Sequence, residues 1–432
     1  LRLERPESGW RQFYGAPENS VWCETVELGD GAVDVLPEAC AAFQERLDIA
    51  HGPLASIVHF RSAAEFGHRL LIAVHHLAID GVSWRILLED LESAYDQALA
   101  GPKEVQLPVR TTSFREWSKS LGDVRRITKL NISRPVGIET PVHLPREGDG
   151  ENYERDATMK VVRLDSAVTA DLLQRSSTAE HLGINATLLT ALALALRNRT
   201  GRDRHLIDLE GHGREEAIVA SLTDKPAHDL SRTIGWFTSM YPVEIAADDD
   251  LGAALEMNGR MLESIPHRGL TYQLVHGSSG ADVLFNYLGQ LDQVVAELKY
   301  LRYAPESTGP WHHPRSRRSH LLEINCAIVD GCFEARWAFN RGIHHEAIID
   351  ETAKDFIDAL RTIVAIRANK SSSPERLSLS PIQQLYFSLE QARPNSGFDQ
   401  WHCEIEGPVE VKRFRAAWDG VSRRHEVLRT TF

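Results

Sequence analysis

Short apolar runs alternate with longer amphipathic segments through most of this chain, and the alternation limits the folds that it can adopt. Residues 54–98 show it clearly, because the apolar runs LASIVHF and RLLIAVHH precede the helix-like segment SWRILLEDLESAYDQALA. The pattern returns in the second half of the chain and continues to a helix-like segment at 346–366. Strands that alternate with helices predict a mixed α/β fold.

The length of the chain predicts two lobes. A chain of 432 residues is too long for one ordinary hydrophobic core. A polar stretch with Pro and Gly at 133–156 interrupts the alternation, and we place the inter-lobe linker at 141–158. Residues 159–366 then form the second lobe, and the polar segment RANKSSSPER at 367–376 is a flexible tether.

Composition argues against several classes of partner. The formal net charge of −13 disfavours nucleic acid, because phosphate binding requires a basic face. The five cysteines are scattered without metal-ligand spacing, and an odd number favours reduced thiols in the cytoplasm. The longest apolar helical stretch, residues 186–196, is too short to span a bilayer, and the first residues do not resemble a signal peptide. We therefore expect a cytoplasmic protein without a membrane partner.

A candidate catalytic loop follows the second apolar run. The segment AVHHLAIDGVSW, residues 73–84, carries His75, His76 and Asp80 between a strand and a helix. One imidazole can take and return a proton near neutral pH while the other packs or orients, and the start of the next helix favours a developing enolate. Asp80 is expected to hold the loop through an arginine, and Gly81 to permit a turn that a side chain would hinder. Two satisfied histidines and a turn are an equal alternative.

A second candidate cluster follows another apolar run. The segment DLEGHGREE, residues 208–216, places Glu210, His212 and Arg214 around two glycines. Returning a proton to carbon with inverted geometry requires a group on each face, and a partly desolvated glutamate suits that task. Glu210 is our candidate, and a surface ion pair between Glu210 and Arg214 is the alternative.

Four segments resemble the epimerization domains of nonribosomal peptide synthetases. In that family's order they are HHLAIDGVSW, EGHGRE, the TIGWFTS part of residues 229–243, and the FNYLGQ part of residues 284–292. The first is shared with condensation domains of the same superfamily, and the other three are signatures of epimerization. The resemblance implies an α/β (α+β) fold with two chloramphenicol acetyltransferase-like lobes, arranged as a V around a central tunnel.

The resemblance also implies an activity. It is epimerization of the α-carbon of an L-aminoacyl or peptidyl thioester, carried on the phosphopantetheine arm of a peptidyl carrier protein, to the D form. By position, His76 and Glu210 become the acid-base pair, while His75, Asn286 and Tyr287 support the site or contact substrate. No metal and no cofactor of its own is implied, and a downstream condensation domain is a second partner. A condensation domain that forms a peptide bond and a non-catalytic carrier-docking module are the alternatives.

Two histidine-rich segments remain beside these motifs. The basic stretch HHPRSRRSH, residues 312–320, can meet an acidic carrier surface or a phosphate, and a solvated loop is the alternative. The pairs His312/His313 and His344/His345 lack a converging acidic or cysteine partner. We therefore predict no metal site.

The last segment of the chain departs from the family's linear order. LSLSPIQQLYF, GFDQ and RRHEVLRTTF resemble the beginning of such a domain, yet they stand within 377–432. A rotated order would combine 1–140 with 377–432 in the N-terminal lobe and bring Arg429 to Asp80. The alternative is a natural junction, in which these residues begin a following condensation-type domain.

Overall fold

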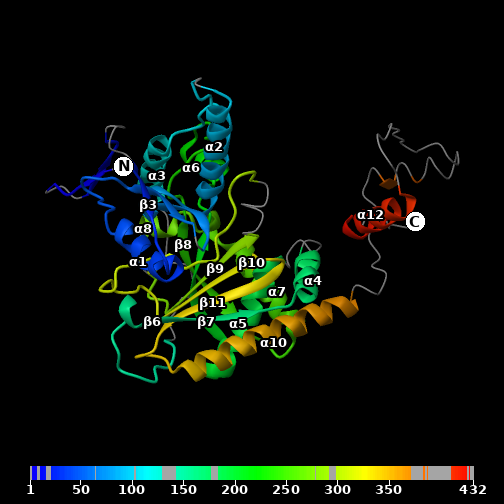
Figure 1. The fold of residues 1–432 in the computed structure, drawn as a ribbon. Helices are drawn as coiled ribbons and strands as arrows, with labels where there is room; N and C mark the ends of the chain where they lie inside the picture. The colour runs from blue at the N-terminus through cyan, green and yellow to red at the C-terminus, as the bar shows by residue number, and fades with distance from the viewer. Residues whose placement is uncertain are drawn as a thin grey trace.

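The computed structural model is a mixed α/β fold, as the alternation of strands and helices predicts (Figure 1). It describes residues 2–6, 10–15, 21–63, 65–101, 104–128, 143–176, 183–277, 279–290 and 298–370, with 383–384, 387, 410–425 and 428. The structural statements below concern these residues.

Six strands form the larger sheet, in the order β6-β11-β10-β9-β7-β8. Their bounds are β6 (Ala157–Arg163), β7 (Arg204–Gly211), β8 (Ser239–Ala246), β9 (Val283–Gln290), β10 (Leu322–Val329) and β11 (Cys332–Asn340). The three central strands, β7, β9 and β10, run parallel, and the flanking pairs are antiparallel. Side chains that follow the carboxyl ends of the central strands therefore meet at one edge.

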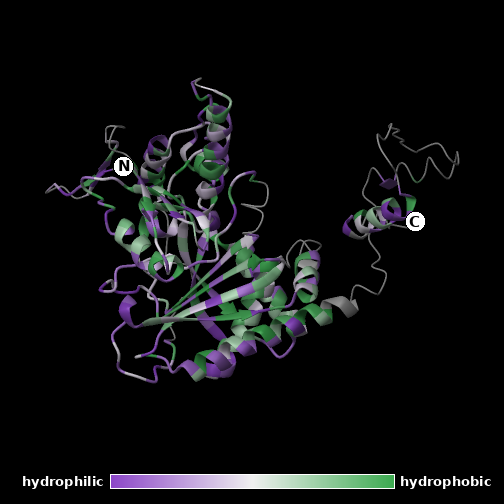
Figure 2. Ribbon diagram, in the orientation of Figure 1, coloured by the Kyte–Doolittle hydropathy of each residue, from purple (hydrophilic) through white to green (hydrophobic). Residues whose placement is uncertain are grey.

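One face of this sheet carries the main hydrophobic core. Helices cover it: α4 (Ser166–Ser176), α5 (Ile184–Thr200), α7 (Leu251–Ser264) and α10 (Glu346–Lys370). Figure 2 shows hydrophobic residues on this layer of helices and strands. Because strand residues alternate between faces, Ile207 and Leu209 enter the core whereas Asp208 and Glu210 lie on the opposite face.

The first part of the chain forms a smaller unit. A sheet of β3 (Val21–Glu27), β4 (Ala55–Ser62) and β5 (Gly67–Val74) packs against α1 (Ala32–Gln44). Two short strands, β1 (Arg2–Glu4) and β2 (Arg11–Phe13), precede it, and α2 (Gly81–Leu99) and α3 (Phe114–Thr128) follow it. Strands β4 and β5 and helix α2 confirm the strand–strand–helix order that the sequence predicts for 54–98.

A segment that follows β9 ties the larger sheet's half of the chain to the smaller unit. Glu306 forms an ion pair of 2.6 Å with Arg69 of β5. Two residues later, the carbonyl oxygen of Thr308 accepts a hydrogen bond of 3.0 Å from Gln44 of α1. The segment therefore connects both layers of the smaller unit to the rest of the molecule.

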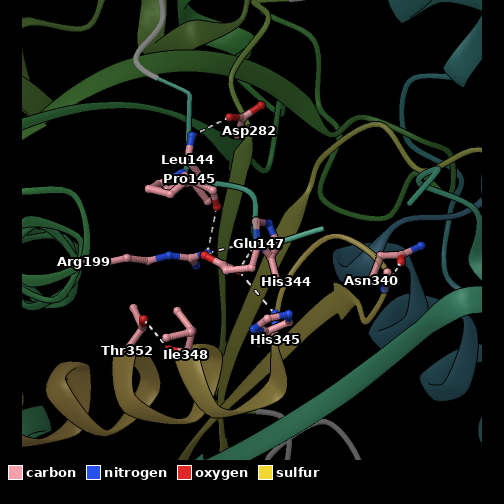
Figure 3. A network of polar contacts seen from close by, with 11 residues as sticks. Leu144, Pro145, Glu147, Arg199, Asp282, Asn340, His344, His345, Ile348 and Thr352 are labelled. Atoms are coloured by element: carbon pink, nitrogen blue, oxygen red, sulfur yellow. Dashed lines mark hydrogen bonds and ion pairs between the residues drawn. The ribbon is translucent and has the colours of Figure 1, made fainter. Parts of the chain in front are cut away.

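A largely buried polar network anchors the predicted linker to the rest of the molecule (Figure 3). Glu147 lies 3.1 Å from the guanidinium of Arg199 on α5 and 3.3 Å from Nδ1 of His344. Arg199 also donates to His344 over 2.9 Å. The expectation that the His344/His345 pair lacks an acidic partner is therefore wrong for His344, whose function here is to pack the linker onto the core.

The remaining helices are short or stand apart. They are η2 (His76–Ala78), η3 (Glu154–Asp156), α6 (Glu216–Thr223), η4 (Pro266–Gly269), α8 (Tyr272–Val275) and α12 (Val411–Arg424). In the parts of the chain described above, no helix combines the length and the apolar character needed to cross a membrane.

Helix α12 stands away from the β3–β5 sheet in Figure 1. Its apolar residues are in solvent, since Val411, Phe414 and Trp418 are 69%, 58% and 55% exposed. This face of α12 is thus not packed against the described part of the lobe that a rotated order requires, and the grouping of 1–140 with 377–432 in one lobe stays a prediction. Arg429 lies outside the described residues, so its contact with Asp80 stays a prediction.

Candidate active site

The two neighbouring histidines occupy different environments after the end of β5. His75 is half-buried, and its Nδ1 accepts a hydrogen bond of 3.2 Å from the backbone N–H of Leu77. Burial, and then the charge of His76, lowers the pKa of His75. His76 is exposed, and its ring lies 5.4 Å from that of Trp236. His75 therefore shapes the turn, while His76 is available to a substrate.

Asp80 fastens the histidine loop to its surroundings. One of its carboxylate oxygens accepts a 2.8 Å hydrogen bond from the N–H of Ser83 and so caps helix α2. The other accepts a 3.0 Å bond from the N–H of Phe237. Arg214 lies 3.4 Å from the same carboxylate. Among the described residues, Arg214 thus takes the place of the arginine expected to hold Asp80.

Arg214 joins three of the sequence motifs. It donates 2.9 Å hydrogen bonds to the hydroxyl of Ser83 and to the carbonyls of Leu230 and Thr233, and its guanidinium stacks 3.9 Å from the centre of the Phe237 ring. Its side chain is only 8% exposed. The alternative ion pair between Arg214 and Glu210 is not formed, which leaves the glutamate for another role.

Two glycines of the motifs differ in whether the position could accept a side chain. Gly213 has a φ of +64°, and a Cβ there would lie 1.7 Å from the carbonyl oxygen of Phe237. By contrast, a Cβ on Gly81 would meet no atom within 4 Å, and its φ lies outside the left-handed region. The expectation that a side chain would hinder the turn at Gly81 was wrong. The close approach occurs at the second glycine of EGHGRE.

Glu210 lies near the carboxyl end of β7, on the face that the helices leave free. Its Oε2 accepts a 2.7 Å hydrogen bond from the amide of Asn286 on β9. Burial raises the pKa of Glu210, the charges of His76 and His320 oppose the rise, and the charge of Glu323 adds to it. A carboxyl group with a raised pKa can act as an acid or a base close to neutral pH.

Asn286 and Tyr287 point to opposite faces of β9. Asn286 shares the face of Glu210, as their hydrogen bond requires. Tyr287 packs against the core on the helix side, and burial raises its pKa to about 12. The predicted contact of Tyr287 with substrate has no support from this position and stays a prediction.

Sequence reasoning missed several residues near Glu210. The segment 312–320 was expected to be a solvated loop or a docking patch, and its first residues are exposed. Arg318 and His320, however, are 6% and 4% exposed, and they contact Glu323 of β10 and Asp208 of β7, respectively. Only the pairing of β10 with β9 brings them there, and no local pattern signals it.

The candidate site combines an exposed imidazole, His76, with a partly buried carboxyl group, Glu210, that accepts a hydrogen bond. The charge of His76 opposes the rise in the pKa of Glu210. In the described part of the chain, no group of three or more His, Cys, Asp or Glu side chains is arranged to hold a metal ion. Such a pair of groups suits proton transfer at carbon.

Comparison with known families gives one match over most of the chain. The model of the condensation domain matches residues 2–378. A linear gramicidin synthase of Brevibacillus parabrevis is 34% identical over 488 aligned residues, which cover 100% of this chain and 6% of that protein. Chondramide synthase cmdD of Chondromyces crocatus is 36% identical over 384 residues, or 84% of this chain and 10% of that protein. The chain thus spans a small fraction of these relatives.

Solved structures share the fold. The epimerization domain from the third module of tyrocidine synthetase B superposes with a TM-score of 0.74 at 28% identity, over 86% of this chain and 85% of that one. The first condensation domain of the calcium-dependent antibiotic synthetase gives 0.56 at 17% identity, over 84% and 83%, which is a likeness of fold alone.

Proposed function

Because the chain belongs to the condensation-domain family, we propose that it is an epimerase acting on a carrier-bound thioester. The substrate is an L-aminoacyl or peptidyl group on the phosphopantetheine arm of a peptidyl carrier protein, and the product is the D form. The carrier protein, and a downstream condensation domain that accepts the product, are the partners. The arm belongs to the carrier, and the epimerase contributes side chains alone.

The contacts that join the histidine loop to the EGHGRE segment carry this proposal, because His76 and Glu210 lie on these two segments. Burial raises the pKa of Glu210, and the charge of His76 opposes the rise. The interlocked contacts of Asp80 and Arg214 hold the two motifs together. The solved epimerization domain, which also has the higher TM-score, supports the same choice between the two activities.

The reaction needs only proton transfer. One of the two groups removes the α-proton, and the electron pair of the C–H bond moves into the thioester as an enolate. The other group returns a proton to the opposite face, which leaves the composition of the substrate unchanged and its configuration inverted. Burial of Glu210 and its hydrogen bond from Asn286 keep this carboxyl oriented for either step.

A condensation activity is the second candidate. Condensation domains share the HHLAIDG loop, and the family match alone does not separate the two reactions. A condensation domain joins two carrier-bound groups through an amide bond, whereas an epimerase acts on a single carrier-bound group. A non-catalytic docking module is the third alternative and needs neither His76 nor Glu210.

The test is to incubate the full chain with an α-deuterated L-aminoacyl carrier, first alone and then with a second loaded carrier. We expect loss of deuterium and formation of the D-aminoacyl thioester in both cases, without peptide bond formation. Formation of a dipeptidyl thioester without loss of label would show condensation instead. Retention of all label and no dipeptide would favour the docking module. His51→Ala, a change at an exposed histidine, is the control for handling of the protein.

We also propose that residues 377–432 begin a following domain. One alignment with the gramicidin synthase extends over 100% of this chain, which favours a natural order of segments. The exposed apolar face of α12 agrees, since such a face requires a partner and the described residues do not cover it. The rotated order, with 1–140 and 377–432 in one lobe, is the competing proposal.

A further inference from the structure

A buried carboxyl group, Asp208, lies two residues before Glu210 on the same strand and pairs with a buried imidazole. Asp208 accepts hydrogen bonds of 2.8 Å from the hydroxyl of Ser279 and 2.9 Å from Nε2 of His320. Asp208 and His320 are each 4% exposed. The proposed proton transfer uses neither of them, although both are titratable groups.

The strand register places this pair on the face of Glu210. Asp208 pairs with Leu284 of β9, and Leu284 pairs with Glu323 of β10. Because side chains alternate along each strand, Asp208, Glu210 and Glu323 all point away from the helix-covered core. His320 precedes β10 by two residues and meets Asp208 at the edge of this polar face.

The hydrogen bonds of His320 suit either charge state. Nε2 donates to Asp208, while Nδ1 lies 3.0 Å from the hydroxyl of Ser319. A hydroxyl group both donates and accepts, so the imidazole keeps two hydrogen bonds whether neutral or protonated. The second oxygen of Asp208 is buried without a hydrogen-bond partner among the described residues.

Three charged groups shift the pKa of Glu210, and they act in opposite directions. His76 in the loop after β5 and His320 in the segment before β10 lower this pKa, whereas Glu323 on β10 raises it. Glu323 is paired with Arg318 at 3.2 Å, and the side chain of Arg318 is 1% exposed. The buried partners on each side, Asp208 and Arg318, keep His320 and Glu323 in place.

We propose that His320 is a positioning residue of this site: held by Asp208, it fixes the charge state in which Glu210 meets the substrate, without touching the substrate. This inference rests on the proposed epimerase function. It assigns a role to a residue that lies at the end of the basic segment 312–320 and that the four family motifs do not include.

The test measures the rate of α-deuterium loss as a function of pH. The midpoint of this profile that disappears in Glu210→Gln reports the titration of Glu210. His320→Gln keeps a donor for Asp208 but removes the positive charge, so the midpoint should rise by about one pH unit. Glu323→Gln removes a negative charge and should lower it by a similar amount. A purely structural role would reduce the rate at all pH values without opposite displacements of the midpoint.

Unchanged midpoints, or displacements in the same direction for both variants, would overturn the inference. Thermal melting checks that each variant folds, and His320→Asn replaces His320→Gln if the latter does not. Absence of label loss in the wild-type chain would instead contradict the proposed function. In that case the ¹³C chemical shift of the Glu210 carboxyl, titrated in the same variants, still reports whether His320 and Glu323 act on it.

Discussion

The carboxylate of Asp80 organises the site at the scale of single residues. It caps α2, receives the N–H of Phe237 and faces Arg214, so it joins the histidine loop to the two motifs of the other half. These bonds orient the backbone beside His76 and leave its ring free. The sequence alone indicated that Asp80 would pair with an arginine. It did not indicate Arg214, because this residue lies 134 positions away and only the fold brings it to Asp80.

The glycine of EGHGRE that follows His212 should be irreplaceable. Gly213→Ala would place a Cβ 1.7 Å from a backbone oxygen at a positive φ, so the free energy of unfolding should fall by more than about 3 kcal/mol. Gly81→Ala is the matched variant, since its Cβ meets nothing, and it should change stability by less than about 1 kcal/mol. Urea unfolding measures both. Equal effects of the two substitutions would contradict the assignment of the close backbone approach to Gly213.

Secondary structure elements were largely predictable, and their pairing was not. Alternating apolar residues indicated β4, β5 and the strands of the larger sheet, because local burial imposes a period of two. The neighbours of β9 depend on long-range contacts that no local pattern encodes. His320 and Glu323 were missed for this reason, whereas His76 and Glu210 could be named as candidates because each lies at or just after the end of a recognisable strand.

The network that anchors the linker to α5 and to the residues before α10 should stabilise the second lobe. Glu147→Gln leaves the buried guanidinium of Arg199 without its counter-charge, so the free energy of unfolding should fall by about 3 kcal/mol near pH 7. Glu244→Gln, which removes a surface ion pair with Arg204, is the control and should cost less than about 1 kcal/mol.

The effect of Glu147→Gln should depend on pH. Burial raises the pKa of Glu147. The charges of Arg199 and His344 lower this pKa by more than burial raises it, so the net pKa lies below its usual value. A lowered pKa contributes stability above the unfolded pKa, and this contribution is lost as the pH falls through the folded value. Urea unfolding should therefore show a smaller difference between wild type and variant in acid. A difference that grows in acid would contradict this account.

At the scale of the whole molecule, side-chain and backbone contacts join the two halves, while helix α12 stands apart. Segment 298–309 and the contacts of Asp80 join the smaller unit to the larger sheet. Helix α12 exposes a row of apolar residues instead. The mixed fold was predictable from the alternation of elements, whereas the order of segments was not, because similar motifs begin successive domains.

Removal of residues 371–432 distinguishes the two proposals for the end of the chain. If these residues begin a following domain, the truncated protein should keep its melting temperature and its rate of deuterium loss within about twofold. A rotated domain would instead lose part of its own lobe, and truncation would unfold it or abolish the reaction. Thermal melting and the deuterium assay together decide between these outcomes.

The most direct test of the central claim, that His76 and Glu210 serve opposite faces of one carbon, is deuterium loss from both L- and D-aminoacyl carriers. The wild type should release label from both enantiomers. His76→Ala and Glu210→Gln should each reduce the rate of deuterium loss at least about 100-fold with one enantiomer and much less with the other. The enantiomer that is strongly affected should differ between the two variants. Impairment of both variants with the same enantiomer alone, or of neither, would contradict the account.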